Sequence, residues 1–300
     1  MDDAMSRGND IPERLDVRAA DFPDVPFLTA FAAATNALRE HAQTFCSTRT
    51  AAIEAELCES VGLGHAFVCL VDDRVVGLAS AFLGHPAGNA DVILFVDPAY
   101  GRYQDAAAAL FARLRAALDP GIRFTFYFPK ENERCARFLA AIGARRRVNE
   151  YQLAVQRGEW KPVEIDGVTP LERTDGPSFK RLYDAIFPDI YLSAEEILDD
   201  LEGRHRVFVA QDETGFVALG VLRLNGPGST TAEVIGVRAD RRGRGWGRTI
   251  LAGLLREAFV NRGAERVDLI VDLDNESAIR LYTDQGFCVE REHACFIVEG

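Results

Sequence analysis

The chain has 300 residues, of which 48% are hydrophobic and 27% charged, with a formal net charge of −12. An acidic chain repels the phosphate backbone of nucleic acid, which argues against a general nucleic-acid binder. The longest apolar runs, such as residues 92–96, are far too short to cross a bilayer, so no membrane partner is expected. The length suits two domains of about 150 residues each.

Cysteine and histidine are dispersed along the chain. The six cysteines and five histidines form no C-x-x-C pair and no H-E-x-x-H motif, so we expect no metal site. The first ten residues are acidic and lack the basic-then-apolar order of a secretory signal. The sequence therefore predicts a cytoplasmic protein.

The first half begins with helical patterns over residues 22–40 and 50–60. HAFVCLV and RVVGLASAF flank an Asp-Asp turn and predict an antiparallel hairpin, and DVILFV predicts a buried strand. An alanine-rich helix over residues 105–118 ends before Pro120-Gly121. The strand RFTFYF, a helix capped by Asn132 and the closing strand NEYQLAV complete this half.

The second half repeats this order. Helical patterns over residues 175–186 and 193–201 precede the hairpin RVFVA and FVALGVLRL, the strand AEVIGV and a helix over residues 247–260. VDLIVDL, a helix opened by Asn275 and the strand ACFIV follow. Residues 157–166, RGEWKPVEID, lack periodicity and predict a linker.

Marker residues of the two halves stand at one fixed distance. Three pairs are each 143 residues apart: Gly77 with Gly220, Asn132 with Asn275, and Gly143 with Gly286. A constant offset indicates an internal repeat, which divides the chain into residues 1–157 and 158–300.

Arginines and glycines concentrate between the predicted strand AEVIGV and the helix that follows it. Arg241, Arg242, Arg244 and Arg248 fall within eight residues, interleaved with Gly243, Gly245 and Gly247. Glycine lets successive backbone N–H groups face one ligand at the first turn of a helix, where the macrodipole favours negative charge. This loop is therefore suited to a small anionic ligand such as a diphosphate.

Two motifs carry a family resemblance. Arg242-x-x-Gly245-x-Gly247 stands between a strand and a helix, and Asn275-x-x-Ala278-x-x-Leu281-Tyr282-x-x-x-Gly286-Phe287 follows downstream. Together they resemble the two signatures of the GCN5-related N-acetyltransferase (GNAT) superfamily. The resemblance covers most of the last hundred residues and implies an α/β fold: two tandem GNAT-like domains, each a mixed, mostly antiparallel sheet flanked by helices on both faces.

The resemblance also implies roles for individual residues. A tyrosine at the place of Tyr282 protonates the departing CoA sulfur, and a glutamate at the place of Glu233 accepts the proton of the amine. Backbone amides around Gly236 and Val237 would polarise the thioester carbonyl. The expected acetyl-CoA contacts are Ile235, Gly236, Val237, Arg242, Gly243, Arg244, Gly245, Trp246, Gly247 and Asn275.

Each of these side chains also has a structural interpretation. Tyr282 could be a core residue with its hydroxyl at the edge, and Glu233 could be an ion-pair partner. Asn275 could serve only as a helix N-cap, a role compatible with ligand contact.

The first half departs from the pattern. Gly101 stands where the motif has arginine or glutamine, Gln104 replaces the first required glycine, Ala106 takes the last position, and Leu139 replaces the tyrosine. We therefore expect residues 1–157 to form a degenerate domain and residues 158–300 the catalytic one. This tandem arrangement is similar to that of the mycothiol synthases.

The sequence thus predicts an N-acetyltransferase that transfers an acetyl group directly from acetyl-CoA to a primary amine of a small molecule, without a metal, as a monomer or homodimer. Two alternatives stay open at this point. One is a non-catalytic acyl-CoA-binding regulator, and the other is an acetyltransferase for protein lysines or N-termini.

Overall fold

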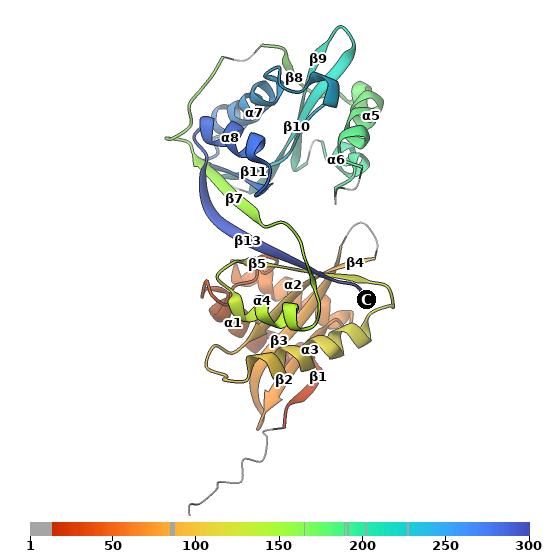
Figure 1. Ribbon diagram of the computed structural model, residues 1–300, viewed down its shortest axis with the longest axis vertical. Helices are drawn as coiled ribbons and strands as arrows, with labels where there is room; N and C mark the ends of the chain where they lie inside the picture. Colours follow the sequence, from red (N-terminus) through yellow and green to blue (C-terminus); the bar gives the residue numbers. More distant parts are fainter. Residues whose placement is uncertain are drawn as a thin grey trace, which may run out of the picture. The chain divides into compact units, whose positions relative to one another are not determined.

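The computed structural model describes residues 14–84, 88–164, 166–188, 190, 192–201, 203–226 and 228–300 (Figure 1). The N-terminal segment on which the cytoplasmic prediction was based lies outside these residues. The described chain divides into two compact units. One runs up to Arg147 and includes Ala294–Gly300, and the other is Val148–His293.

The first unit contains a mixed sheet between two layers of helices. Its strands are β1 (Asp16–Ala19), β2 (Ala66–Val71), β3 (Arg74–Gly84), β4 (Asn89–Val96), β5 (Arg123–Pro129) and the end of β13 (Cys288–Val298), in that order, with β6 (Arg145–Arg146) beside β13. β4 and β5 are parallel, whereas β1 to β4 pair antiparallel. One face packs on α1 (Val25–Asn36) and α2 (Thr50–Gly62), and the other on α3 (Tyr103–Ala117) and α4 (Glu133–Ala141). The short helix η1 (Phe22–Asp24) precedes α1.

The second unit repeats this architecture. Its strands lie in the order β13, β7 (Glu150–Gln156), β12 (Arg266–Asp272), β11 (Ser229–Val237), β10 (Gly215–Gly226), β9 (His205–Asp212) and β8 (Val168–Pro170). Helices α5 (Gly176–Ile186) and α6 (Ala194–Asp199) cover one face, and α7 (Trp246–Arg256) and α8 (Glu276–Asp284) the other (Figure 1). Short helical turns precede α5 at Arg173–Asp175 and α7 at Ala239–Arg241, and a π turn, Glu257–Asn261, extends α7. The predicted fold class is therefore confirmed.

The repeated marker residues have the same physical role in both units. A Cβ on Gly77 in β3 would lie 2.8 Å from Leu110 Cδ1 of α3, and one on Gly220 in β10 would lie 2.5 Å from Ile250 Cγ2 of α7. Both glycines thus let a helix pack directly on the sheet. The side chains of Asn132 and Asn275 cap α4 and α8 by accepting backbone N–H groups three residues on.

The closing strands pair differently from the expectation. β7, predicted to close the first half, pairs along its whole length with β12 of the second unit. The end of β13, expected in the second half, pairs with β6 through Phe296↔Arg146 and Ile297↔Arg145. The first half of the sequence therefore gives β7 to the second unit, whereas β13 pairs with β7 through Cys288–His293 and only its end belongs to the first unit. The contacts divide the chain after Arg147 and after His293, whereas the boundary at residue 157 stays a prediction about the sequence repeat.

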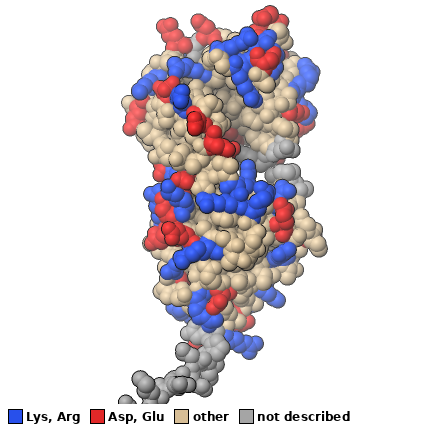
Figure 2. Space-filling view, in the orientation of Figure 1, with Lys and Arg blue, Asp and Glu red and all other residues tan. Residues whose placement is uncertain are grey.

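Among the described residues, no helix has the length and hydropathy needed to span a bilayer. The visible face in Figure 2 carries lysines and arginines interleaved with acidic side chains.

Candidate functional site

The arginine-glycine loop joins β11 to α7 and is open to solvent. Gly243 and Gly245 have φ of 74° and 89°, the left-handed region that favours glycine. Gly245 is the N-cap of α7, and residues 242–245 are all exposed. The first backbone N–H groups of a helix have no partner within it, so this surface offers several donors together with the positive end of the helix dipole.

Beside this loop the strands β11 and β12 separate. In the described chain their parallel pairing covers three positions, Ser229–Thr231 against Arg266–Asp268, although β11 continues to Val237 and β12 to Asp272. The other edge of β11 stays paired with β10 as far as Val237. The backbone groups of residues 234–237 that face β12 therefore need a partner other than β12, and an extended ligand could supply it.

Glu233 is the extra residue of a β-bulge. Val221 of β10 opposes Val234, but the next residue, Leu222, opposes Ala232, so Glu233 has no counterpart. A bulge bends a strand and redirects a side chain. The position 143 residues earlier is Ala90, where β3 and β4 keep a regular register. At this position the described part of the first unit thus has neither the carboxylate nor the bulge.

The carboxylate of Glu233 is buried, with only 5% of its side chain exposed, and it is ion-paired. Its Oε2 lies 3.2 Å from His205 Nε2, and its Oε1 lies 3.1 Å from Arg223 Nε. His205 Nδ1 in turn lies 3.3 Å from Asp200 Oδ2. Through His205 and Asp200, at the end of α6, Glu233 is linked to the side of the sheet covered by α5 and α6.

Tyr282 lies on α8, on the opposite side of the sheet. It is 8% exposed, and its ring centroid is 5.8 Å from that of Phe287. Ile235, Val237 and Trp246 pack against the same hydrophobic core as Tyr282. Burial raises the pKa of Tyr282 to about 12, which keeps the phenol in its donor form throughout the neutral range.

Helix α8 is held against the start of α7. A Cβ on Gly247 would be 3.4 Å from Leu281 Cδ2, and Arg248 Nη2 donates to Asp284 Oδ2 at 2.8 Å. These contacts place the residue before Tyr282 next to the glycine loop.

The four arginines have different surroundings. Arg241 is paired with Asp212 and Asp240, each at 2.7 Å, and Arg248 with Asp284. Arg242 donates to the carbonyl of Val237 at 3.2 Å, and Arg244 is exposed with no partner among the described residues. Arg242 and Arg244 are therefore the cations not already engaged by carboxylates.

Two other predicted contacts have clear structural roles. Asn275 caps α8, its Oδ1 accepting from the backbone N–H of Ala278 at 3.2 Å. A Cβ on Gly236 would lie 2.7 Å from the Phe187 ring, so glycine is required there for packing with the end of α5. In the described chain, no group of three or more His, Cys, Asp or Glu residues is placed to hold a metal ion.

Comparison with known proteins finds a similarity in this unit. The model of the acetyltransferase (GNAT) family matches residues 176–287, which include the loop, the bulge and α8. Over these residues the chain is similar to the acetyltransferase (GNAT) family.

A curated protein matches a short part of the chain. A mycothiol acetyltransferase of Corynebacterium aurimucosum is 44% identical over 61 residues, which are 20% of this chain and 19% of that protein. The match thus spans about a fifth of the relative's length.

Solved structures match the fold of the whole chain. A GCN5-related N-acetyltransferase from Sphaerobacter thermophilus has a TM-score of 0.70 at 18% identity, covering 96% of each chain. A tandem GNAT protein from the clavulanic acid biosynthesis pathway has a TM-score of 0.65 at 17% identity, covering 95% of this chain and 98% of that one. Both share the fold of this chain over nearly its whole length.

The first unit lies outside the GNAT family match, and its loop differs physically. Arg102 Nε pairs with Asp105 Oδ2 at 2.7 Å just where α3 begins, and Gly101 is the one glycine in this turn. Leu139, at the position of the tyrosine, is fully buried. This unit therefore has neither the glycine-rich turn nor the phenol of the second unit.

Sequence reasoning missed His205, Arg223 and Asp212. Each contacts a predicted residue across neighbouring strands or from a hairpin, at a distance in sequence that no local pattern encodes. In the sequence, only their charge indicated that they could form ion pairs with the predicted residues.

Proposed function

We propose that the chain is an N-acetyltransferase that transfers the acetyl group of acetyl-CoA directly to a primary amine of a small molecule. The observation that carries this proposal is the exposed loop of left-handed glycines at the start of α7, beside the free edge of β11. The backbone N–H groups of residues 243–247, with Arg242 and Arg244, would bind the diphosphate. The pantetheine would extend along residues 234–237.

The positions of Glu233 and Tyr282 then limit where the thioester can react. Glu233 is on the α5–α6 side of β11 and Tyr282 on the α7–α8 side, so one thioester reaches both only between the separated strands β11 and β12. There the amine nitrogen attacks the carbonyl carbon, the C–S bond breaks, and the amine proton leaves towards Glu233. A backbone N–H of residues 236–237 would stabilise the oxyanion.

Tyr282 acts on the departing sulfur. A phenol with a pKa of about 12 is a weaker acid than a thiol, whose ordinary pKa is about 8.5. We infer that the phenol donates a strong hydrogen bond to the thiolate and that the proton lost by the amine finally reaches the sulfur. Below about pH 11 the phenol stays protonated, so it adds no falling limb to the pH–rate profile.

The test is the release of free CoA thiol in the presence of a panel of primary amines. Tyr282→Phe keeps the ring against Phe287 and removes only the hydroxyl, so it should lower kcat by about 10²-fold or more while the Kd for acetyl-CoA stays within about two-fold. Tyr151→Phe, on β7, is the matched control and should leave kcat unchanged. Tight acetyl-CoA binding without turnover of any amine, or turnover indifferent to Tyr282→Phe, would contradict the proposal.

A further inference from the structure

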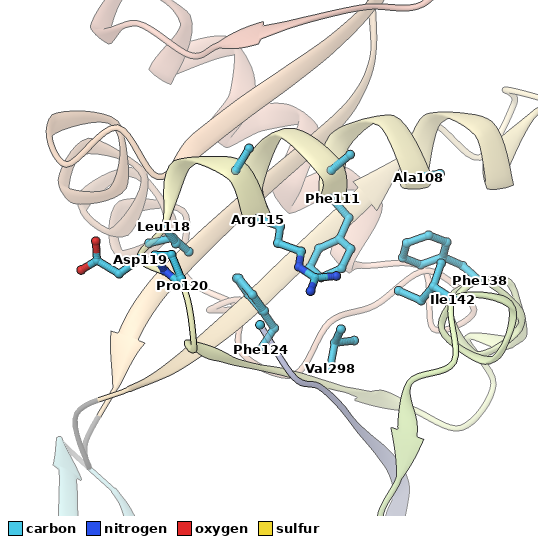
Figure 3. A pocket seen from close by; sticks show the side chains of 13 residues that line it. Ala108, Phe111, Arg115, Leu118, Asp119, Pro120, Phe124, Phe138, Ile142 and Val298 are labelled. Atoms are coloured by element: carbon cyan, nitrogen blue, oxygen red, sulfur yellow. The ribbon is translucent and has the colours of Figure 1, made fainter.

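A groove of about 650 Å³ is lined by residues of the first unit. Its walls are the exposed side of α3, the end of α4, Phe124 of β5 and Val298 of β13 (Figure 3). The lining is mostly apolar, and the volume is within the range of small-molecule sites, about 300–1,000 Å³.

The repeat shows why this groove exists. Alanines 108, 112 and 116 line it at helical spacing, and the residues 143 positions later are Leu251, Leu255 and Phe259. Those three larger side chains are buried in the core of the second unit. Along one face of a helix the first unit therefore has methyl groups where the second unit has three bulky core residues.

In the second unit an indole covers the equivalent position. Trp160 packs on Phe259 with a ring-centroid distance of 5.3 Å, and Arg157 Nε donates to the carbonyl of Ala264 at 2.8 Å. A Cβ on Gly286, after α8, would lie 2.6 Å from the carbonyl of Glu159. The counterpart of Phe259 is Ala116, which lines the groove. The groove is thus shaped to accommodate a planar ring.

The groove also contains one cationic side chain, that of Arg115. Arg115 reaches from α3 across the groove between Phe124 and Phe138 (Figure 3). No residue of the described chain pairs with its guanidinium, and the equivalent position in the second unit is Ala258, a buried core residue. Asp119 also lines the groove, but its carboxylate points away from the centre (Figure 3). A guanidinium beside an apolar surface is suited to a carboxylate on a hydrophobic body.

We propose that this groove binds a small aromatic carboxylate, with the ring on the alanine face of α3 and the carboxylate on Arg115. Every residue that lines the groove belongs to the first unit, whereas the proposed acetyl-CoA contacts belong to the second.

The proposal is tested by calorimetric titration of the full chain with indole-3-propionate and with its neutral amide. We expect saturable binding, with the acid tighter than the amide by about ten-fold, the size of a hydrogen bond to a charged group. Arg115→Gln should reduce the affinity for the acid to that for the amide. Ala116→Phe, which installs the residue of the second unit, should abolish binding of both. Saturating acetyl-CoA should not displace the probe.

Four results would overturn the proposal: no saturable binding of either probe at millimolar concentration, equal affinity for acid and amide, binding unchanged in Ala116→Phe, or displacement by acetyl-CoA. Thermal unfolding of each variant verifies that it is folded. Analytical sedimentation tests whether a second copy of the chain occupies the groove instead. A dimer that dissociates in Ala116→Phe would assign the groove to self-association instead.

Discussion

Replacing Gly220 by alanine should separate α7 from β10. The new Cβ would lie 2.5 Å from Ile250 Cγ2 and 3.0 Å from Leu254 Cδ1, well inside van der Waals contact. Both leucine and isoleucine are fully buried, so neither can move into solvent. Overpacking of this kind costs about 2 kcal/mol of unfolding free energy.

Tryptophan fluorescence during urea unfolding measures this loss of unfolding free energy in the second unit, because both tryptophans, Trp160 and Trp246, lie in Val148–His293. With an m value of about 2 kcal/mol per M, the midpoint should fall by about 1 M. Gly176→Ala is the control: its Cβ would meet only Leu198 methyls at 3.7 Å, an ordinary contact.

The cause of the Gly220 effect can be isolated with a double-mutant cycle. The same substitution should cost less in an Ile250→Ala background, where the nearest colliding atom is gone. A midpoint that does not move in Gly220→Ala, or a cost that is independent of residue 250, would refute direct packing of α7 on the sheet.

Further predictions concern the loop. Gly245→Ala should lower the unfolding free energy by about 1 kcal/mol, since φ is 89° there, whereas Gly247→Ala, inside α7, should not lower it. Arg241→Ala should lower the urea midpoint at pH 7. Hydrogen bonds from Thr214 and Arg241 hold the pKa of Asp212 below its ordinary value, so this stabilisation is present above about pH 4 and is lost as pH falls further. Arg244→Ala should leave the midpoint unchanged and weaken acetyl-CoA binding, measured by calorimetry; the opposite pattern for the two arginines would contradict their assignment.

Local patterns predicted the elements of both units well. The helix expected over residues 50–60 is Thr50–Gly62, and the one opened by Asn132 is Glu133–Ala141. These boundaries depend on caps, glycines and hydrophobic spacing, which are properties of a few neighbouring residues. The internal repeat was predictable for the same reason, because Gly220 and Gly77 are required by a close contact that recurs in each unit.

The partners of elements and charges could not be predicted in this way. The alternation in β7 specifies a strand but not which sheet edge it joins, and the edge of β12 proved to be its partner. The bulge at Glu233 is a property of the register with β10, and the contacts of Glu233 with His205 and Arg223 depend on three strands. Sequence reasoning therefore identified the loop and the helix of the site, but not the network that buries its carboxylate.

Native mass spectrometry with acetyl-CoA measures the central claim most directly, because it counts ligands on each chain. The wild-type chain should retain one acetyl-CoA, and the double variant Arg242→Ala, Arg244→Ala should retain none while it stays folded. No bound acetyl-CoA, two per chain, or one that persists in the double variant would show that the glycine loop before α7 is not where this chain binds its acyl donor.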